Sequence, residues 1–492
     1  MTNRREFLLG LGATLPMTSL AIPQAGAERA SAQWNVLFLG VDDLRPQLGC
    51  FGDGFAHTPN IDAIGKRGTV FRRTYCQQAF CGPSRAALLT GLRPDTTHVY
   101  DLNTSFRKAV PDAVTLPQLF KQNGYFTQNV GKIFHGNEIM NDRISWSVPE
   151  QLNMVTKHDQ YVLAKNKDLK DEWHKTSSTE IAEVPDDAYI DGRIADAGIK
   201  ALRQIKDKPF FLAVGFNKPH LPFAAPKRYW NLFDRSKVPM PANPHRPKDC
   251  PPYALPAYSE LRSYDDVVDS GPIAEEKIRE ILHGYYAAGA YTDANIGRVM
   301  NELERLGLAS KTIIVLWADH GWHLGEQDYW GKITNFEVST HVPLLISVPG
   351  KPRQHTDALV ELIDIYPTLA ELCGLQAPAA LQGTSVAAHL NDASLPGKKA
   401  AYSQYPRKEA STGGERLMGY TMRTNRYRYT EWRRMNHSIH DVELYDHQAD
   451  PHESRNVGRL EENKKTIAIL SARMHHDLSL PVYSNVTGKE SL

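Results

Sequence analysis

The sequence predicts an α/β protein built around a mainly parallel β-sheet. Four apolar runs, at residues 34–41, 209–216, 312–318 and 342–348, have the length and composition of buried parallel strands. Helical patterns lie between them, and strands that alternate with helices favour a parallel sheet sandwiched by helices. Ligands bind such sheets beyond the carboxyl ends of the strands, so we expect the functional site there.

The composition is that of an ordinary globular protein. The chain has 492 residues, a formal net charge of +1 at pH 7, 41% hydrophobic residues and 23% charged residues. These values exclude collagen-like, disordered and polytopic membrane proteins, and the lack of a basic surplus argues against nucleic-acid binding. The length allows one large domain and a smaller one. The five cysteines are an odd and sparse set, which does not indicate a disulfide framework.

Residues 1–27 have the features of an export signal. Arg4 and Arg5 precede a mildly apolar run, and residues 25–27 are small, as at a cleavage site. The paired arginines resemble the twin-arginine signal of bacteria, so we expect the twin-arginine export machinery as a partner and a periplasmic or extracellular location. An ordinary secretory signal or a membrane anchor is the alternative. The run is short for a spanning helix, and no later stretch is long and apolar enough to cross a membrane.

Residues 28–395 are predicted to form the large α/β domain. Gly307 is expected to end a long helix just before the strand at 312–318. Polar, irregular sequence at 137–186 and 227–270 indicates surface insertions, which often shape ligand pockets. Helices are expected at four places: 60–67, 83–90, 114–123 and about 274–306.

Residues 396–492 are predicted to form a smaller α+β subdomain. Residues 420–432 alternate in the manner of antiparallel strands, with Tyr427 and Tyr429 on one face and Arg428 on the other. A helix at 460–477 is expected near the end of the chain.

One short motif places a cysteine at the start of a helix. It begins at Cys81, continues through Pro83, Ser84 and Arg85, and ends at Gly91, in the pattern C-x-P-S-R-x-x-x-L-T-G. Because proline suits the first turn of a helix, we expect Cys81 just before a helix N-terminus, where backbone N–H groups and the helix dipole favour an anion. Arg85 can aim at the same place. The residues alone indicate a nucleophile facing an oxyanion, although a cysteine in such a position is more often a core residue.

Two acidic pairs follow two of the predicted strands. Asp42 and Asp43 come after the first strand, and Asp319 and His320 come after the third. Because the carboxyl ends of parallel strands meet at one edge of a sheet, both pairs should project there. Three carboxylates and an imidazole suit a hard divalent cation such as calcium or magnesium. One acidic pair alone is usually a solvated loop, but two pairs beside the Cys81 motif favour a metal site.

Lysines and histidines form a third group of candidates. Lys132 and His135 follow a short predicted strand, His220 follows the second long strand, and Lys332 lies in a later loop. Taken one at a time, each is more often structural or exposed than catalytic, since the chain has 19 histidines.

The Cys81 motif resembles the signature of the type I sulfatases. In that family the cysteine is oxidised to formylglycine, whose hydrate is the nucleophile. The resemblance implies an alkaline-phosphatase-like fold and a formylglycine-generating maturation enzyme as a partner, with Ser84 helping that enzyme to recognise Cys81. It also implies that Arg85 stabilises the modified residue.

The same resemblance implies roles for the other candidates. Lys132 and Lys332 would bind the sulfate oxygens, together with His220. His135 would act on the formylglycine hydroxyl, and His220 would protonate the leaving alcohol. Calcium, with magnesium as the alternative, would be held by Asp42, Asp43, Cys81, Asp319 and His320.

Further motifs resemble the iduronate-2-sulfatase branch of this family, and they extend from about Trp34 to about Asn456. They include residues 42–46, 49–53, 93–97, 100–103, 131–135, 404–407 and 418–420. This narrower resemblance implies the 2-O-sulfate of a uronic acid, at the end of a sulfated oligosaccharide or polysaccharide, as the substrate.

Three alternatives stay open. The first is a phosphate or phosphonate monoester hydrolase of the same superfamily. The second is a non-catalytic exported protein that binds sulfated glycans, which the complete set of motif residues disfavours. The third is a cysteine metal-site or redox protein, which is disfavoured because no other cysteine lies at ligand spacing from Cys81.

Overall fold

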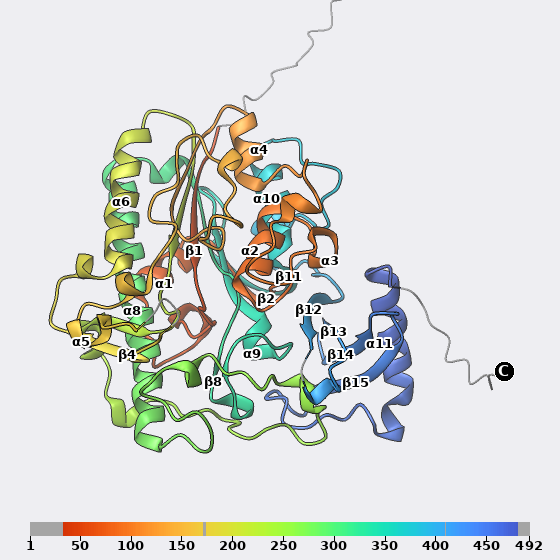
Figure 1. Ribbon diagram of the computed structural model, residues 1–492. Helices are drawn as coiled ribbons and strands as arrows, with labels where there is room; N and C mark the ends of the chain where they lie inside the picture. Colours follow the sequence, from red (N-terminus) through yellow and green to blue (C-terminus); the bar gives the residue numbers. More distant parts are fainter. Residues whose placement is uncertain (1–32, 171–173, 409, 481–492) are drawn as a thin grey trace, which may run out of the picture. The chain divides into compact units, whose positions relative to one another are not determined.

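The computed structural model describes residues 33–170, 174–408 and 410–480 (Figure 1). The predicted export signal at residues 1–27 lies outside the described residues. Within the described residues, no helix combines the length and the apolar character that crossing a bilayer requires.

Seven strands form the central sheet, in the order β11-β2-β10-β7-β1-β5-β3. Neighbouring strands pair in parallel except at β10, which runs antiparallel to both β7 and β2. The sheet is therefore mainly parallel, and the predicted fold class is confirmed. The strands are β1 (Asn35–Val41), β2 (Thr69–Tyr75), β3 (Phe126–Gly131), β5 (Phe210–Phe216), β7 (Thr312–Ala318), β10 (His341–Ser347) and β11 (Gln354–Glu361).

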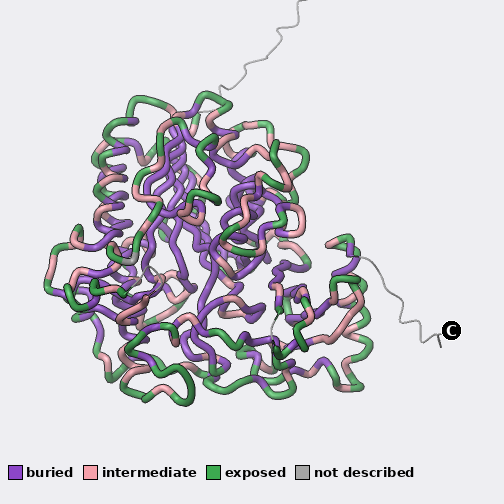
Figure 2. The backbone as a smooth tube through the Cα atoms, in the orientation of Figure 1, coloured by how far each residue is buried: buried purple, intermediate pink, exposed green. Residues whose placement is uncertain are grey.

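The centre of this sheet is buried on both faces. Every residue of β1, β5 and β7 is buried, as expected for parallel strands covered by helices. Figure 2 shows the buried backbone concentrated along these strands and the exposed residues in outer loops. The four predicted apolar runs match β1, β5, β7 and β10 to within one residue at each end.

Helices flank the sheet, with α6 and α8 on one side and α2 and α10 on the other (Figure 1). The four predicted helices correspond to α1, α2, α4 and α8. The helix α6 was not predicted from the sequence, although Ile190, Ile194 and Leu202 give it a buried apolar face. The helices are α1 (Pro59–Gly65), α2 (Cys81–Thr90), α3 (Pro94–Thr97), α4 (Leu116–Gln122), α5 (Ala164–Lys167), α6 (Ile190–Ile205), α7 (Lys227–Trp230), α8 (Glu275–Arg305), α9 (Glu337–Thr340), α10 (Ile365–Leu372) and α11 (Lys464–Asp477).

The two predicted insertions consist mainly of loops and short turns. A small parallel sheet joins the end of the first insertion to the segment before the second, through β4 (Thr179–Ala182) and β6 (Phe223–Pro226). A two-stranded antiparallel ladder, β8 (His323–Leu324) with β9 (Trp330–Gly331), stands just before Lys332.

A second sheet of four antiparallel strands follows the central one in the chain. Its strands are β12 (Ala401–Arg407), β13 (Leu417–Arg423), β14 (Tyr427–Arg434) and β15 (Ile439–Asp446). The helix α11 packs on it through Leu470 and Met474, which share an apolar cluster with Tyr429. The predicted division of the chain at residues 395 and 396 stays a prediction.

Buried ion pairs connect this sheet to α9. Arg428 on β14 donates through Nε to Glu453 Oε1 at 2.6 Å and pairs with Glu337 on α9. Arg423 donates to Glu337 Oε2 at 3.0 Å, and His447 Nε2 lies 2.9 Å from Glu453 Oε1. We call these five residues the C-terminal clamp.

Candidate active site

The two acidic pairs meet at one edge of the central sheet. β1 and β7 are parallel neighbours with Val41 opposite Ala318, so the residues that follow them leave the sheet together. The backbone N–H of Asp43 donates to Asp319 Oδ1 at 3.2 Å. Asp42, Asp43, Asp319 and His320 are each at most 1% exposed.

The backbone of Asp43 adopts a left-handed conformation, with φ of 58°. Aspartate tolerates this region better than most residues because its short side chain can bond locally. The carbonyl of Asp43 accepts a hydrogen bond from the Tyr285 hydroxyl at 2.9 Å, which fixes the turn from the α8 side.

Cys81 and Arg85 approach this edge from α2. The helix begins at Cys81 itself rather than just after it, because Pro83 still lies in the first turn, where its missing N–H is not needed. Spacing of four residues puts Cys81 and Arg85 on the same face. Cys81 Sγ lies 3.2 Å from His320 Nε2 and 3.5 Å from Asp42 Oδ1.

Arg85 binds both acidic pairs and the neighbouring loop. Its Nε donates to Asp319 Oδ2 at 2.8 Å, and its Nη2 lies 3.4 Å from Asp42 Oδ1. Its Nη1 donates to the carbonyls of Lys132 and Ile133 at 2.6 and 3.0 Å. The Arg85 side chain is fully buried, and these partners hold it in one position.

The donor set fits a hard divalent cation. Oxygen, nitrogen and sulfur atoms of Asp42, Cys81, Asp319 and His320 all lie within 4.8 Å of one another, and Asp43 forms a second such group with Cys81 and His220. Carboxylate oxygens predominate among these donors, as in calcium and magnesium sites. The five residues predicted as metal ligands thus lie together in the structure.

Lys132 and Lys332 reach the carboxylates from opposite loops. Lys132 follows β3 and forms an ion pair with Asp42, whereas Lys332 Nζ lies 2.9 Å from Asp43 Oδ1. The position of Lys132 requires the backbone after β3 to pass close to Gly215 in β5. A Cβ on residue 215 would lie 2.0 Å from the Lys132 carbonyl oxygen. Only glycine fits at position 215.

His135 and His220, the two histidines predicted to transfer protons, line one small cavity. It encloses about 200 Å³ and is bordered by Asp42, Lys132, His135, Lys218 and His220, among others. His135 Nδ1 is buried without a hydrogen-bond partner among the described residues. Burial, and then the charge of Lys132, lower the pKa of His135 to about 2, so this imidazole is neutral at pH 7.

His220 is hydrogen-bonded at Nδ1, and carboxylates face its Nε2. Its Nδ1 lies 2.6 Å from the Leu221 carbonyl, which indicates that Nδ1 carries the hydrogen, and its Nε2 lies 3.9 Å from Asp43 Oδ2. Burial, and then Lys332, lower the pKa of His220 to about 3.

The electrostatics differ between the two adjacent aspartates. Burial alone would raise the pKa of Asp42, but Lys132, His220 and Arg85 hold it well below its usual range. At Asp43, burial and the nearby carboxylates outweigh Lys332, and the pKa lies well above its usual range. The ionised form is therefore stabilised at Asp42 and disfavoured by burial at Asp43.

Two site residues were not identified from the sequence. Glu260 comes from the second insertion and contacts both His220 and Lys332. Nothing in the local sequence distinguishes it from the other acidic residues there. Lys218 comes two residues before His220 in the sequence. Its Nζ donates to the carbonyls of His220 and Pro222 at 2.9 and 2.7 Å, so it shapes the loop that carries His220.

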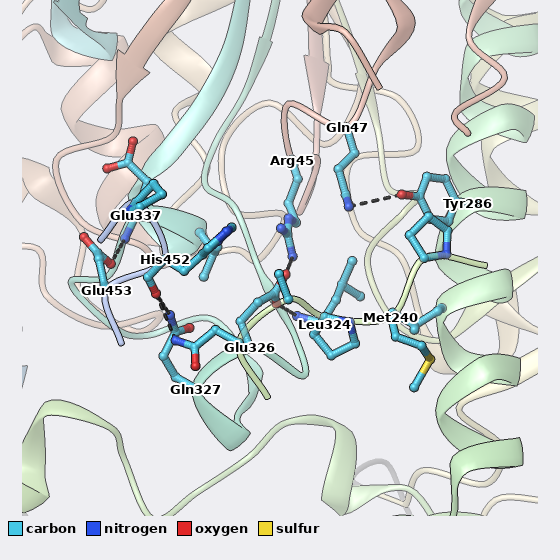
Figure 3. A pocket seen from close by; sticks show the side chains of 17 residues that line it. Arg45, Gln47, Met240, Tyr286, Leu324, Glu326, Gln327, Glu337, His452 and Glu453 are labelled. Carbon is cyan, nitrogen blue, oxygen red and sulfur yellow. Dashed lines mark hydrogen bonds and ion pairs between the residues drawn. The ribbon is translucent and has the colours of Figure 1, made fainter. Parts of the chain in front are cut away.

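Another cavity contains none of the predicted site residues. It encloses about 260 Å³ and lies near Arg45, Tyr286 and Glu326 (Figure 3). Arg45 Nη1 and Glu326 Oε1 form an ion pair of 2.8 Å across it. The site predicted from the sequence is therefore separate from this cavity.

Two family profiles match most of the chain. The sequence profile described as Sulfatase matches residues 34–375, and the profile described as N-sulphoglucosamine sulphohydrolase, C-terminal, matches residues 325–479. The chain is 35% identical to the iduronate 2-sulfatase of Mus musculus, over 88% of its own length and 92% of that relative.

Solved structures share the fold. A phosphonate monoester hydrolase from Silicibacter pomeroyi has a TM-score of 0.75 at 22% identity, covering 91% of this chain and 96% of that chain. A protein solved in complex with its substrate D-glucosamine-2-N,6-O-disulfate has a TM-score of 0.71 at 23% identity, covering 91% and 98%. The alkaline-phosphatase-like fold expected from the sequence is thereby confirmed.

Proposed function

The chain belongs to the sulfatase family and is a sulfuric ester hydrolase, and from this premise we propose that it removes the 2-O-sulfate of a uronic acid at the end of a sulfated glycan. The observation that carries the proposal is the packing of Cys81 and Arg85 against both acidic pairs. The 35% identity with an iduronate 2-sulfatase over most of the chain favours this substrate over other sugar sulfates.

Cys81 is proposed to be converted to formylglycine by a maturation enzyme, for which Ser84 is part of the recognised sequence. Burial, and then Asp42, raise the pKa of the Cys81 thiol well above its usual range, so the unmodified thiol stays protonated and is a weak nucleophile. Formylglycine hydrate would supply a nucleophilic hydroxyl at this position.

Mass spectrometry of the tryptic peptide spanning residues 74–85 tests this modification. The expected result is the mass of formylglycine at position 81 in protein produced together with a maturation enzyme. An active preparation in which Cys81 is fully unmodified would contradict the proposal.

The proposed metal is calcium, with magnesium as the alternative, held by Asp42, Asp43, Asp319 and His320 together with residue 81. A bound divalent cation would polarise the sulfate ester and offset the clustered carboxylates. Burial is the main cause of the raised pKa of Asp43, and neighbouring carboxylates add to it; a bound divalent cation would offset both effects.

The remaining residues have separate roles in the proposed reaction. Lys132 and Lys332 bind the sulfate oxygens and stabilise the charge that develops on them. His220, which also borders the sulfate, acts on the departing sugar oxygen through Nε2. Because its imidazole is neutral in this structure with the hydrogen on Nδ1, the proton on Nε2 must be gained when the anionic sulfate ester binds and raises the pKa of this ring. His135 is neutral at pH 7 and can accept a proton in the cavity that it shares with Lys132. Arg85 holds the nucleophile's surroundings rigid through its buried bonds to Asp42 and Asp319.

Export through the twin-arginine machinery, and a periplasmic or extracellular location, belong to the same proposal. They are supported by Arg4, Arg5 and the small residues at 25–27. The substrate is then a sulfated oligosaccharide or polysaccharide outside the cytoplasm.

A panel of esters tests the substrate. Purified, modified enzyme is given 2-O-sulfated uronic acid disaccharides, 4-O- and 6-O-sulfated hexosamines, and phosphate and phosphonate monoesters of matched leaving group. We expect kcat/KM for the 2-O-sulfated uronic acid to exceed the others by at least about a hundredfold, a difference of about 2.7 kcal/mol in transition-state stabilisation.

Other results would replace the proposal by a named alternative. Faster hydrolysis of phosphate or phosphonate esters would assign the chain to a monoester hydrolase of the same fold. Binding of sulfated sugars without release of sulfate by modified protein would indicate a glycan-binding role.

A further inference from the structure

Glu260 brings a carboxylate from the second insertion into the candidate site. Its Oε1 lies 3.5 Å from His220 Nε2, and its Oε2 lies 3.2 Å from Lys332 Nζ. The side chain is only 14% exposed. Burial would raise the pKa of Glu260, but Lys332 and His220 more than offset this and hold the pKa below its usual range. Glu260 is therefore a carboxylate that faces two groups of the proposed reaction.

The chain fixes this carboxylate in place from several sides. The Ser259 hydroxyl donates to the Trp330 carbonyl at 2.6 Å, and the Tyr329 hydroxyl donates to the Tyr258 carbonyl at 3.0 Å. These two bonds tie the residues before Glu260 to the strand that leads into Lys332. Ser263 Oγ donates to the Glu260 carbonyl at 2.6 Å, and Leu261 is fully buried in an apolar cluster. The position of Glu260 is thus built into the fold.

The carboxylate of Glu260 faces the Nε2 edge of the His220 ring, at a contact that becomes an ion pair when the imidazole is protonated. Nδ1 is already bonded to the Leu221 carbonyl, so a partner at Nε2 determines where the opposite edge of the imidazole points. Glu260 Oε1 is the nearer of the two carboxylates around Nε2, at 3.5 Å compared with 3.9 Å for Asp43. A general acid must present its donor atom within hydrogen-bond reach of the leaving oxygen, so this orientation bears directly on catalysis.

The position of the Lys332 ammonium group depends less on Glu260 than the orientation of the His220 ring does. Its Nζ keeps two contacts with Asp43, at 2.9 and 3.0 Å, when the contact with Glu260 is removed. Loss of the carboxylate should therefore disturb the leaving-group side of the site more than the sulfate-binding side.

From this geometry we propose that Glu260 is a positioning residue that orients His220 toward the leaving oxygen of the sugar. The proposal rests on the proposed function, because it assigns the leaving-group side to His220. It extends that function to a residue outside the family motifs quoted above.

The experiment compares Glu260→Gln with wild type and with Asp269→Asn, an exposed carboxylate change in the same insertion. Each modified enzyme is assayed with its best sulfated sugar from the ester panel and with an aryl sulfate whose phenol leaves without protonation. The competitive inhibition constant of inorganic sulfate and the thermal unfolding midpoint are measured on the same preparations.

We expect Glu260→Gln to lower kcat on the sugar sulfate by about 10- to 100-fold, with KM within about threefold. This is less than the roughly 100- to 10,000-fold that general acid catalysis contributes, because His220 itself is retained. The aryl sulfate rate and the inhibition constant of sulfate should also stay within about threefold, and Asp269→Asn should match wild type.

A rise in KM and in the sulfate inhibition constant, with kcat retained, would overturn the proposal. It would show that Glu260 positions Lys332 for sulfate binding and does not act through His220. Equal losses on both esters, or no loss on the sugar sulfate, would overturn it as well. If wild type does not hydrolyse the aryl ester, the test is whether Glu260→Gln changes kcat on the sugar sulfate or the sulfate inhibition constant. A loss in kcat alone supports the proposal, and a change in the inhibition constant alone contradicts it. Failure of wild type to release sulfate from any sugar would instead contradict the proposed function.

Discussion

The candidate site and the C-terminal clamp both bury several charges, but they balance them differently. In the clamp, Glu337 and Glu453 each face an arginine, and burial of Glu337 is outweighed by Arg423 and Arg428, so its pKa lies well below the usual range. At the sheet edge, burial and neighbouring carboxylates outweigh Lys332, and the pKa of Asp43 lies well above its usual range.

Partner bonds show the same contrast. His447 in the clamp is held by Glu453 at 2.9 Å and by Arg423 at 2.9 Å. At the site, His135 Nδ1 is buried without a hydrogen bond to the described residues, whereas Arg85 Nη2 has the ion-pair contact with Asp42 at 3.4 Å. A buried polar atom without a partner costs free energy unless a ligand satisfies it. The comparison indicates that the clamp is complete by itself, whereas the site is arranged to receive charged ligands.

The largest effect is expected from Cys81→Ala. It should lower sulfate release by at least about a thousandfold, because no other nucleophile occupies this position in the proposed reaction. Stability should change little, since Sγ contacts Asp42 and His320 rather than the apolar core. Activity assays and urea denaturation check both points.

Cys373→Ala is the matched control for this substitution. Cys373 is half-buried against the main apolar cluster, so its loss should cost some stability and leave the activity per folded molecule intact. Activity of Cys81→Ala within tenfold of wild type would show that another group is the nucleophile.

The next effect is expected in the clamp. Arg428→Met leaves Glu337 and Glu453 short of a buried partner, and breaking such a pair typically costs about 3–5 kcal/mol in the free energy of unfolding. Arg426→Met is the control, because Arg426 pairs with Asp446 at the exposed surface and should matter little. Equal urea midpoints for the two variants would refute the view that the clamp is a structural element.

A smaller effect concerns pH and Glu443 in β15. Burial raises the pKa of this carboxyl to about 7, whereas in the unfolded chain it is about 4.3. The folded protein therefore holds this proton more tightly, and the stability it contributes is present below pH 4 and lost as pH rises through 7. The loss should amount to about 4 kcal/mol over the whole interval.

Urea denaturation of wild type and Glu443→Gln between pH 5 and 8 measures this contribution. The variant should lose less stability across this interval than wild type, because glutamine does not titrate. Parallel pH profiles would mean that Glu443 is ionised in the folded protein.

The smallest effect is expected from calcium on unmodified protein. A ligand that binds only the folded state stabilises it by about 2.7 kcal/mol at a hundredfold excess over its Kd. Asp319→Asn should abolish this stabilisation, while His447→Gln in the clamp should retain it, since Arg423 and Glu453 already occupy the imidazole. Thermal unfolding with calcium and with chelator provides the measurement; calcium dependence that disappears only in His447→Gln would place the ion in the clamp.

Much of the fold could be predicted because its signals are local. The runs that became β1, β5, β7 and β10 are apolar over most of their length, which marks strands buried on both faces. Several elements were not predicted, among them α6 and β2. β2 mixes buried Phe71 with exposed Arg72, so its pattern is that of a strand only once its neighbours β10 and β11 are known.

The candidate site was predictable to the extent that it consists of motif residues at strand and helix ends. The parallel pairing of β1 with β7 is enough to bring Asp42 and Asp43 beside Asp319. Glu260 was not predictable, because it lies 217 positions from Asp43 in the sequence. Hydrogen bonds of the two preceding residues place it in the site: the Ser259 hydroxyl donates to the Trp330 carbonyl, and the Tyr258 carbonyl accepts from the Tyr329 hydroxyl.

The sequence by itself determined the α/β class, the Cys81 motif and the residues that follow the main strands, because these depend on periodicity and on the chemistry of short segments. Only the tertiary structure decided which charges balance one another. Ion pairs such as Lys332 with Asp43 and Glu260, or Arg428 with Glu337 and Glu453, join residues far apart in the chain. Their effect on pKa depends on burial and distance, which exist only once the chain has folded.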